Sequence, residues 1–401
     1  MVIKNGGKRI YFLFIGQHLF FIRFLLTVRG IVLSSGRNII IKPPLRAAFI
    51  FLGACMIFLI CALPLGIKKK NDEIVLGMFH PFLQIQPIAG DPQKHINHWG
   101  FRGEEISKLK PAGTYRIFVL GGSTVFCGEV PFEKCHTRIL EKLLRQHYPG
   151  RRIEVQNAGM DWYTSQHSLI QFLIKVQDFD PDLIVTWHGI NDMLRSFSPN
   201  LYAHGPYKED YSHFYGPLGR MMENYTQDKR PKGTSLFELV YGRLSDYWFS
   251  DFHGRTNLKS VPIEHWKSLP AFERNMSNLV SVVQSKGIDM IVASQPFLYR
   301  QDLTKKERKH LWFSSTFMTQ DGMLPNLESL IAGMNQFNEK SKSIAARGNP
   351  PCHFIDLEKM VPKTMEYFTD DVHFTELGNK VIGDALSNLL IDLKVMDKKY
   401  S

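Results

Sequence analysis

Four short polar motifs along the chain carry the residue types that acyl-transfer chemistry requires. They are Gly121-Gly122-Ser123-Thr124, Asn157-Ala158-Gly159, Gly189-Ile190-Asn191-Asp192 and Asp370-Asp371-Val372-His373. Ser123 offers a hydroxyl nucleophile, which needs a neighbouring base to remove its proton. His373 can be that base, and Asp370, three residues earlier, can orient the imidazole and stabilise its cation. We therefore predict Ser123, His373 and Asp370 as a catalytic triad.

The same motifs offer hydrogen-bond donors for the negatively charged oxygen of a tetrahedral intermediate. Removing one such donor typically slows an enzyme by about 10²–10³-fold. We expect three donors, namely the backbone N–H groups of Ser123 and Gly159 and the side-chain amide of Asn191. Each motif alone also fits an ordinary turn or a helix cap. Together the four motifs form a complete set for acyl transfer.

No motif indicates a cofactor or a metal ion. Residues 121–128 lack the lysine of a phosphate-binding loop and the glycine spacing of a dinucleotide-binding turn. His95 and His98 have no third metal ligand near them in the sequence. Cys127 lies four residues past Ser123, and because no basic partner is evident we interpret it as a packed thiol. We expect an enzyme that uses neither a cofactor nor a metal.

An alternation of short apolar strands and amphipathic helices positions these motifs. The predicted strands are Arg116–Leu120, Ile153–Gln156, Leu183–Trp187, Asp289–Ala293 and His353–Leu357. The predicted helices are Phe132–His147, Ser165–Val176, Ala271–Ser285, Leu327–Ala346 and Glu376–Leu393. This pattern is typical of an α/β fold with a parallel sheet covered on both faces. In such a sheet, ligands bind at the carboxyl ends of the strands, which is where we expect the motifs to lie.

One stretch interrupts the alternation. Met193–Trp266 is rich in Tyr, His, Phe, Gly and Pro and has no clear period. We interpret residues 193–265, within a few residues at either end, as an insertion that forms a lid or a wall of the substrate site.

The first seventy residues have the composition of a membrane anchor. Ala47–Ile67 has 21 residues without a charge, and about 20 apolar residues span a bilayer. Residues 1–70 hold 11 of the 49 Lys and Arg and no acidic residue, so residues 71–401 carry 38 basic and 38 acidic residues. The net charge of +11 therefore belongs to the predicted anchor. A neutral folded part argues against a nucleic-acid partner.

The number of membrane segments decides the side on which the folded part lies. Ile10–Leu33 is apolar but carries Arg23 and Arg29, and a charge in mid-membrane costs about 2.5–3.5 kcal/mol on insertion scales. We interpret this segment as lying at the membrane interface, which predicts a single-pass protein with its folded part outside the cytoplasm. A second span would place the folded part in the cytoplasm.

Cysteine usage does not identify the compartment. Cys55 and Cys61 lie in the predicted span. The remaining three, Cys127, Cys135 and Cys352, permit one disulfide at most and require none.

The order G-G-S-T, N-A-G, G-I-N-D, D-x-V-H resembles the four sequence blocks of the SGNH (GDSL-type) hydrolase family, from about Arg116 to the end of the chain. The run Asn97–Gly103 (NHWGFRG) resembles a lead-in found in membrane-anchored bacterial members. The resemblance implies a flavodoxin-like three-layer α/β domain with esterase, lipase or O-acyltransfer activity and no metal. It also implies the same triad and oxyanion residues. Two positions depart from the family pattern, with Gly122 in place of an aspartate and Asp161-Trp162 in place of a turn of small residues.

The predicted organisation has four parts. Residues 1–46 form a basic region with an interfacial helix, 47–67 a transmembrane helix, 68–110 a linker and lead-in segment, and 111–401 the hydrolase domain.

We predict a membrane-anchored serine esterase that removes O-acyl groups, above all acetyl, from a carbohydrate or glycolipid. A lipid substrate is also compatible with a site close to the bilayer. An O-acyltransferase acting on a cell-surface polysaccharide would use the same triad, with a sugar hydroxyl in place of water. A non-catalytic polysaccharide-binding or scaffold subunit is a further alternative, but binding alone does not require the five site residues.

Overall fold

A computed structural model of the chain describes residues 77–80, 82–196, 260–311, 324–350 and 352–396, together with two short strands near the amino terminus. The chain divides into two compact units, residues 1–71 with 230–252 and residues 72–229 with 253–401. In the first unit only the antiparallel pair β1 (Ile31–Val32) and β2 (Asn38–Ile39) is described. The second unit contains the other described elements.

Five parallel strands form the central sheet of the second unit, in the order β11-β9-β7-β5-β6. They are β5 (Thr114–Gly121), β6 (Arg152–Asn157), β7 (Leu183–Trp187), β9 (Asp289–Ala293) and β11 (His353–Ile355). This is the flavodoxin-like order 2-1-3-4-5, in which ligands bind between the first and third strands, where the order reverses. Here those strands are β5 and β7, and all their residues are buried.

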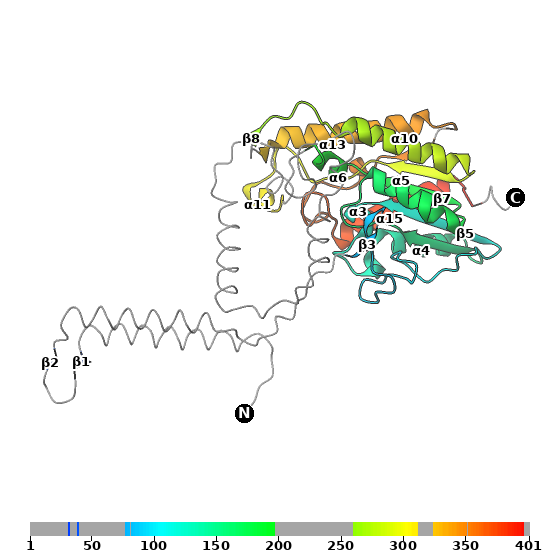
Figure 1. Cartoon of the computed structure of the whole chain (residues 1–401), viewed down its shortest axis with the longest axis horizontal. Helices are drawn as coiled ribbons and strands as arrows, with labels where there is room; N and C mark the ends of the chain where they lie inside the picture. Colours follow the sequence, from blue (N-terminus) through cyan, green and yellow to red (C-terminus); the bar gives the residue numbers. More distant parts are fainter. Residues whose placement is uncertain are drawn as a thin grey trace. The chain divides into compact units, whose positions relative to one another are not determined.

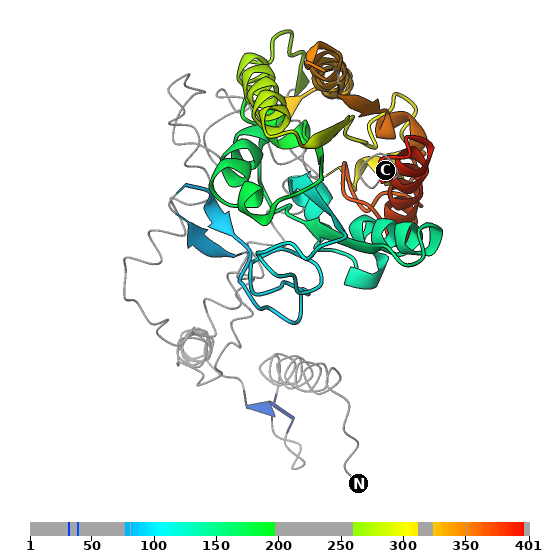
Figure 2. The same cartoon turned by 90° about the vertical axis from the view of Figure 1, so that its right-hand side faces the viewer.

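Helices cover both faces of the sheet (Figures 1 and 2). On one face α4 (His136–His147) packs against α15 (Glu376–Asp392). On the other face α10 (Leu269–Ser285) packs between α5 (Ser165–Ile174) and α13 (Leu327–Arg347). The three-layer α/β architecture is therefore confirmed.

Short elements complete the described part of the unit. The helical ones are α3 (Ser123–Phe126), η1 (Phe132–Lys134), η2 (Val176–Phe179), α6 (Ile190–Leu194), α11 (Lys305–Arg308) and α14 (Leu357–Met360). The strands are β3 (Met78–His80) paired antiparallel with β4 (Gln84–Gln86), and β8 (Ser260–Val261) paired parallel with β10 (Leu324–Pro325).

The predicted helix Phe132–His147 is interrupted in the structure. Cys135 has an extended backbone (φ −71°, ψ 141°) and separates η1 from α4. The apolar spacing of this segment continues across Cys135, so the break left no sign in the hydrophobic pattern.

Several predictions concern residues outside the described part. The predicted span Ala47–Ile67 lies there, as does the interfacial segment Ile10–Leu33 except for the two residues of β1. Among the described residues, no helix has the length and hydropathy needed to cross a membrane. Most of the predicted insertion, residues 197–259, also lies outside the described part.

Candidate active site

Ser123 is the first residue of α3, the helical turn that directly follows β5, and its side chain is nearly buried. His373 and Asp370 lie in the loop that leads into α15. The Nε2 atom of His373 is 2.8 Å from Ser123 Oγ, and its Nδ1 atom is 2.7 Å from Asp370 Oδ2. The structure thus brings the three residues predicted as a triad into one hydrogen-bonded chain, with the imidazole between the hydroxyl and the carboxylate.

The backbone of its own turn holds the Asp370 carboxylate. Asp370 Oδ1 accepts hydrogen bonds from the N–H groups of Val372 and His373, both at 2.9 Å. Burial works to raise the pKa of Asp370, but the hydrogen bonds from His373 and from the turn outweigh it and lower this pKa. An ionised Asp370 accepts the Nδ1–H of His373, which leaves Nε2 with the lone pair that can take the Ser123 proton.

Two more carboxylates act on His373. Glu129 Oε1 is 3.8 Å from His373 Nε2, and the Glu129 side chain is 41% exposed. Burial disfavours the charged imidazole, but the hydrogen bond to Asp370 and the charges of Glu129 and Asp161 raise the pKa of His373 to about 9. Burial, reinforced by Glu129, raises the pKa of Asp161 to about 6. Sequence analysis missed Glu129 because it lies in a loop without a motif.

Asn191 lies in the first turn of α6, with its amide beside the turn that carries Ser123. Its Nδ2 atom donates to the carbonyl oxygen of Tyr163 at 3.0 Å, and a Cβ atom at Gly122 would lie 2.7 Å from Nδ2. Gly122 has an ordinary φ of −84°, so this glycine is needed for space and not for its backbone conformation. Nδ2 carries a second hydrogen, which can serve an oxyanion that forms next to Ser123.

A buried carboxylate next to Asn191 links α6 to α5. Asp192 accepts hydrogen bonds from the Ser165 N–H at 3.0 Å and from Ser165 Oγ at 2.5 Å. Burial outweighs these hydrogen bonds and raises the pKa of Asp192 to about 6. On the other side of the helix start, Gln295 Oε1 accepts from the Ile190 N–H at 3.0 Å. These contacts fix the backbone on either side of Asn191.

Gly159 lies against α3, but its N–H already makes a hydrogen bond to a residue just before it in the chain. It donates to Asn157 Oδ1 at 2.9 Å. A Cβ atom at Gly159 would lie 2.6 Å from the backbone nitrogen of Phe126, so the missing side chain lets the loop approach the helix. The assignment of this N–H as an oxyanion donor stays a prediction, and such a role requires the bond to Asn157 to open.

A buried arginine from the lead-in segment holds the carboxyl end of α3. The guanidinium of Arg102 donates to the carbonyl oxygens of Phe126 at 2.8 Å and Val130 at 2.7 Å, and also to that of Cys127. Arg102 is only 4% exposed. Its place in the run NHWGFRG was visible in the sequence, but its contact with the serine helix was not.

Two more side chains fix α3 from the neighbouring strands. Asn157 Nδ2 donates to the carbonyl oxygen of Val125 at 2.5 Å, and Trp187 Nε1 donates to Thr124 Oγ1 at 3.1 Å. With Arg102, these contacts restrain the helical turn that presents Ser123.

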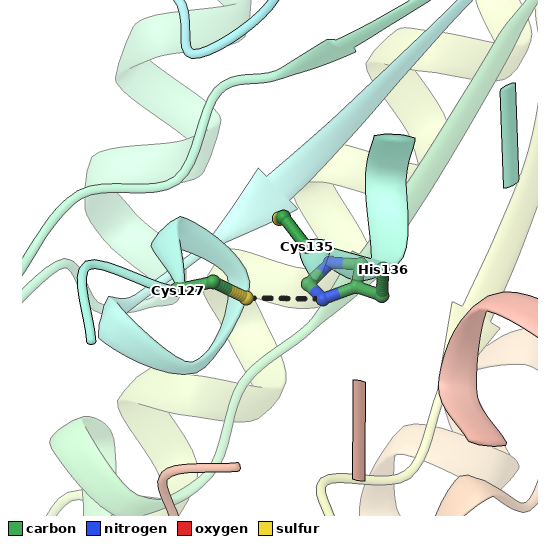
Figure 3. Close-up of side chains that lie close together, drawn as sticks. All are labelled: Cys127, Cys135 and His136. Carbon is green, nitrogen blue, oxygen red and sulfur yellow. Dashed lines mark hydrogen bonds between the residues drawn. The ribbon is translucent and has the colours of Figure 1, made fainter. Parts of the chain in front are cut away.

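The sequence showed no basic residue near Cys127, but the structure places the His136 imidazole beside it. Cys127 Sγ lies 3.1 Å from Nδ1 of His136, the first residue of α4 (Figure 3). His136 lies nine residues further along the chain. The loop between the two residues folds back and brings their side chains together, which the sequence pattern did not show. The thiol is nevertheless packed, with 3% of Cys127 exposed.

Comparison with known proteins assigns the chain to a family. Residues 119–381 match the model of the GDSL-like lipase/acylhydrolase family. No curated protein sequence matches the chain.

Solved structures to which the chain is similar include the acetylxylan esterase Axe2 from Geobacillus stearothermophilus, at 15% identity with a TM-score of 0.38, covering 70% of this chain and 94% of that one. The acetyl xylan esterase AlAXEase is similar at 14% identity with a TM-score of 0.39, covering 69% and 99%. An alpha/beta hydrolase from the metagenome of Lake Arreo, Spain, is similar at 14% identity with a TM-score of 0.39, covering 68% and 93%.

The family model covers both ends of the hydrogen-bonded chain, from the strand that leads to Ser123 to the helix that follows His373. The chain therefore belongs to the GDSL-like lipase/acylhydrolase family, and it is a hydrolase of ester bonds.

Proposed function

We propose that the protein is a serine esterase in which Ser123 is the nucleophile, His373 the general base and acid, and Asp370 the group that orients and stabilises the imidazole. The observation that carries this proposal is the chain of hydrogen bonds from Ser123 Oγ through His373 to Asp370, at 2.8 and 2.7 Å. A nucleophile and base within hydrogen-bond distance, with the base oriented by a third group, are the features of an activated serine.

The first half-reaction forms an acyl-enzyme. His373 Nε2 takes the Ser123 proton while Oγ attacks the ester carbonyl carbon, and Asp370 stabilises the resulting imidazolium. The carbonyl oxygen becomes an oxyanion. The Ser123 N–H, which as the first of α3 has no acceptor within the helix, and the second Nδ2 hydrogen of Asn191 can both stabilise it. His373 then returns its proton to the leaving alkoxide, which departs as an alcohol.

The second half-reaction uses water. His373 Nε2 takes a proton from the water molecule as its oxygen attacks the acyl carbon. The bond to Ser123 Oγ then breaks, Oγ regains its proton from His373, and the carboxylic acid leaves. Each proton taken by the imidazole in one half-reaction is returned within that half-reaction.

We propose a neutral acylated carbohydrate as the substrate, with acetyl as the acyl group. Glu129 and Asp161 place carboxylates around His373. Carboxylate oxygens accept hydrogen bonds from sugar hydroxyl groups. Their charge also repels a phosphate, which disfavours a phospholipid next to the reacting ester.

The substrate proposal is tested by comparing kcat/KM for acetylated xylo-oligosaccharides, p-nitrophenyl octanoate and phosphatidylglycerol vesicles, with the full chain in detergent. We expect the acetylated oligosaccharides to be the best substrates. A preference for octanoate or phosphatidylglycerol would contradict the proposal. Consumption of the acetyl donor that depends on an added sugar and releases no acetate would identify an acyltransferase instead.

We also propose that residues 47–67 anchor the protein in a membrane as a single span, with the hydrolase domain outside the cytoplasm. The support is the uncharged stretch of 21 residues, together with the concentration of basic residues and the lack of acidic ones in residues 1–70.

A further inference from the structure

A cluster of two cysteines and a histidine lies behind the serine helix, separate from the triad. Cys127 follows α3, Cys135 precedes α4, and His136 begins α4. Their sulfur and ring nitrogen atoms all lie within 4.8 Å of one another. Figure 3 shows Cys127 reaching from the turn after α3 towards the His136 ring, with Cys135 on the adjoining segment. The residues are at most 3% exposed.

Asn379 on α15 organises the cluster. Its Oδ1 atom accepts from the His136 N–H at 3.2 Å, from His136 Nδ1 at 2.9 Å and from Cys127 Sγ at 3.0 Å. Its Nδ2 atom donates to the carbonyl oxygens of Phe374 at 3.4 Å and Thr375 at 3.0 Å, which fixes the orientation of the amide. The proton of the neutral His136 ring is therefore on Nδ1, where it meets this acceptor.

This arrangement disfavours a metal ion. A metal bound between the two sulfurs would need the lone pair of Nδ1, and the ring proton would have to move to Nε2. Nε2 of His136 is buried and has no hydrogen-bond partner among the described residues. Metal-binding histidines nearly always donate their other ring N–H to an acceptor, so binding here would leave a buried donor unsatisfied.

The two thiols differ in the way that disulfide chemistry requires. Burial and the neighbouring Cys135 raise the pKa of Cys127 well above its usual value. Burial opposes ionisation of Cys135 too, but the neighbouring Cys127 thiol, His136 and Arg102 lower the pKa of Cys135. A thiolate is the attacking form in disulfide formation, and in this pair it is Cys135.

We propose that Cys127 and Cys135 form a disulfide bond when a small thiol oxidant is present, and that this bond ties the end of the nucleophile helix α3 to the start of α4. Two S–H bonds break and one S–S bond forms, and the two protons and two electrons pass to the oxidant. An azo oxidant such as diamide becomes its hydrazine, and a disulfide such as oxidised glutathione becomes two thiols. The two sulfur atoms lie at most 4.8 Å apart. They therefore need to move towards each other by less than about 3 Å to reach the S–S bond length of about 2.05 Å.

The surroundings of the pair are compatible with the bond. Asn379 Oδ1 loses the Cys127 donor but keeps both donors from His136. The loop between the cysteines includes the exposed residues Gly128 and Glu129, so an oxidant has a short path to the sulfurs when the loop opens. Closing a loop in the unfolded chain stabilises the folded one, and the oxidised form should therefore melt at a higher temperature.

The test treats the purified full chain with diamide, alkylates it in denaturant, digests it and maps the cysteines by mass spectrometry. We expect a Cys127–Cys135 cross-linked peptide lighter by two hydrogen atoms, with Cys352 alkylated. The Tm should rise by a few degrees and fall again with dithiothreitol. The matched control Cys352→Ser should keep the bond and the Tm shift, and Cys135→Ser should lose both.

Three results would overturn the proposal. One is full alkylation of both Cys127 and Cys135 after diamide treatment. Another is a disulfide that joins either clustered cysteine to Cys352. The third is about one zinc ion per chain in the untreated protein that is absent from Cys135→Ser, because this would make the cluster a metal site. The first measurement uses the wild-type chain, so it does not depend on the folding of the variants.

Discussion

Gly122 leaves room for the Asn191 amide, because a side chain at position 122 would collide with it. A Cβ atom at this position would lie 2.7 Å from Asn191 Nδ2 and 3.0 Å from the Tyr163 carbonyl oxygen. We therefore expect Gly122→Ala to displace the amide and to lower kcat for ester hydrolysis by about 10²-fold, the usual effect of losing one oxyanion donor. Asn191→Ala should have a similar effect. The exposed Gly128, whose Cβ would meet only the Phe126 ring at 3.3 Å, provides the control Gly128→Ala, and an equal loss of kcat there would contradict this reasoning.

Glu129 should raise the pH at which the enzyme becomes active. His373 works as a base only when neutral, and its pKa is raised to about 9, so kcat/KM should rise with pH up to about 9 and then level off. Glu129→Gln removes a negative charge 3.8 Å from Nε2, so the pKa of His373 falls. The rising limb of the plot of kcat/KM against pH then moves to lower pH. Because solvent screens the partly exposed Glu129, we expect a gain of only several-fold in kcat/KM at pH 7.

The pH prediction is checked by measuring kcat/KM between pH 6 and pH 10. Glu273→Gln is the matched control, since Glu273 lies on α10 and pairs with Lys340 and Arg347. A rising limb that stays in place, or moves to higher pH, in Glu129→Gln would show that Glu129 does not act on the base.

Sequence reasoning at the residue scale worked best for side chains at strand ends. Ser123 and Asn191 lie in the first turns after the buried strands β5 and β7, so their position at the sheet edge could be predicted. Glu129, His136 and Arg102 could not be placed, because each depends on how a loop folds back. The bond between Cys127 and Asn379 spans 252 residues, and no local pattern indicates such a contact.

At the scale of elements, α3 depends on Arg102 at the end opposite Ser123. Arg102→Met would remove a charged donor from three carbonyl oxygens at the end of α3, and we expect it to lower the free energy of unfolding by about 2–4 kcal/mol. Because α3 carries the nucleophile, kcat should also fall by about tenfold or more. Stability is measured by urea denaturation and kcat at a temperature where the variant is folded.

Arg116 provides the matched control for this prediction. It is fully buried near the start of β5, at the other end of the strand from Ser123, and its Nε donates to Glu154 at 2.8 Å. Arg116→Met should be destabilising to a similar degree with kcat nearly unchanged in the folded protein. Equal losses of kcat in both variants would mean that Arg102 acts only through general stability.

The long elements were predictable because their hydrophobic patterns are strong. The strands Leu183–Trp187 and Asp289–Ala293 have the predicted bounds, since a strand buried on both faces is a continuous apolar run. The hairpin of β3 and β4 was missed because strands of three residues are too short to show an alternation of apolar and polar residues. The same limit applies to the break at Cys135, where a single residue changes its backbone conformation.

At the scale of the whole molecule, the charge distribution predicts a membrane protein with a neutral hydrolase domain. We expect the full chain to sediment with membranes, to resist extraction by sodium carbonate and to dissolve in detergent, because removal of about 20 apolar residues from a bilayer is strongly unfavourable. Replacing Ile57 and Leu59, near the middle of the stretch, by Arg should release part of the protein, since each charge in mid-span costs about 2.5–3.5 kcal/mol. Extraction of the unaltered chain by carbonate alone would contradict the anchor.

The central claim is that Ser123 is activated by His373 and Asp370, and its most direct test is labelling with a fluorophosphonate followed by peptide mapping. The account predicts a single phosphonylated residue, Ser123, with labelling that is lost in Ser123→Ala and strongly slowed in His373→Asn. Hydrolysis of p-nitrophenyl acetate should fall by about 10³-fold or more in both variants, while their Tm stays close to that of the wild type. Labelling at another serine, or unchanged hydrolysis by a folded Ser123→Ala protein, would contradict the account.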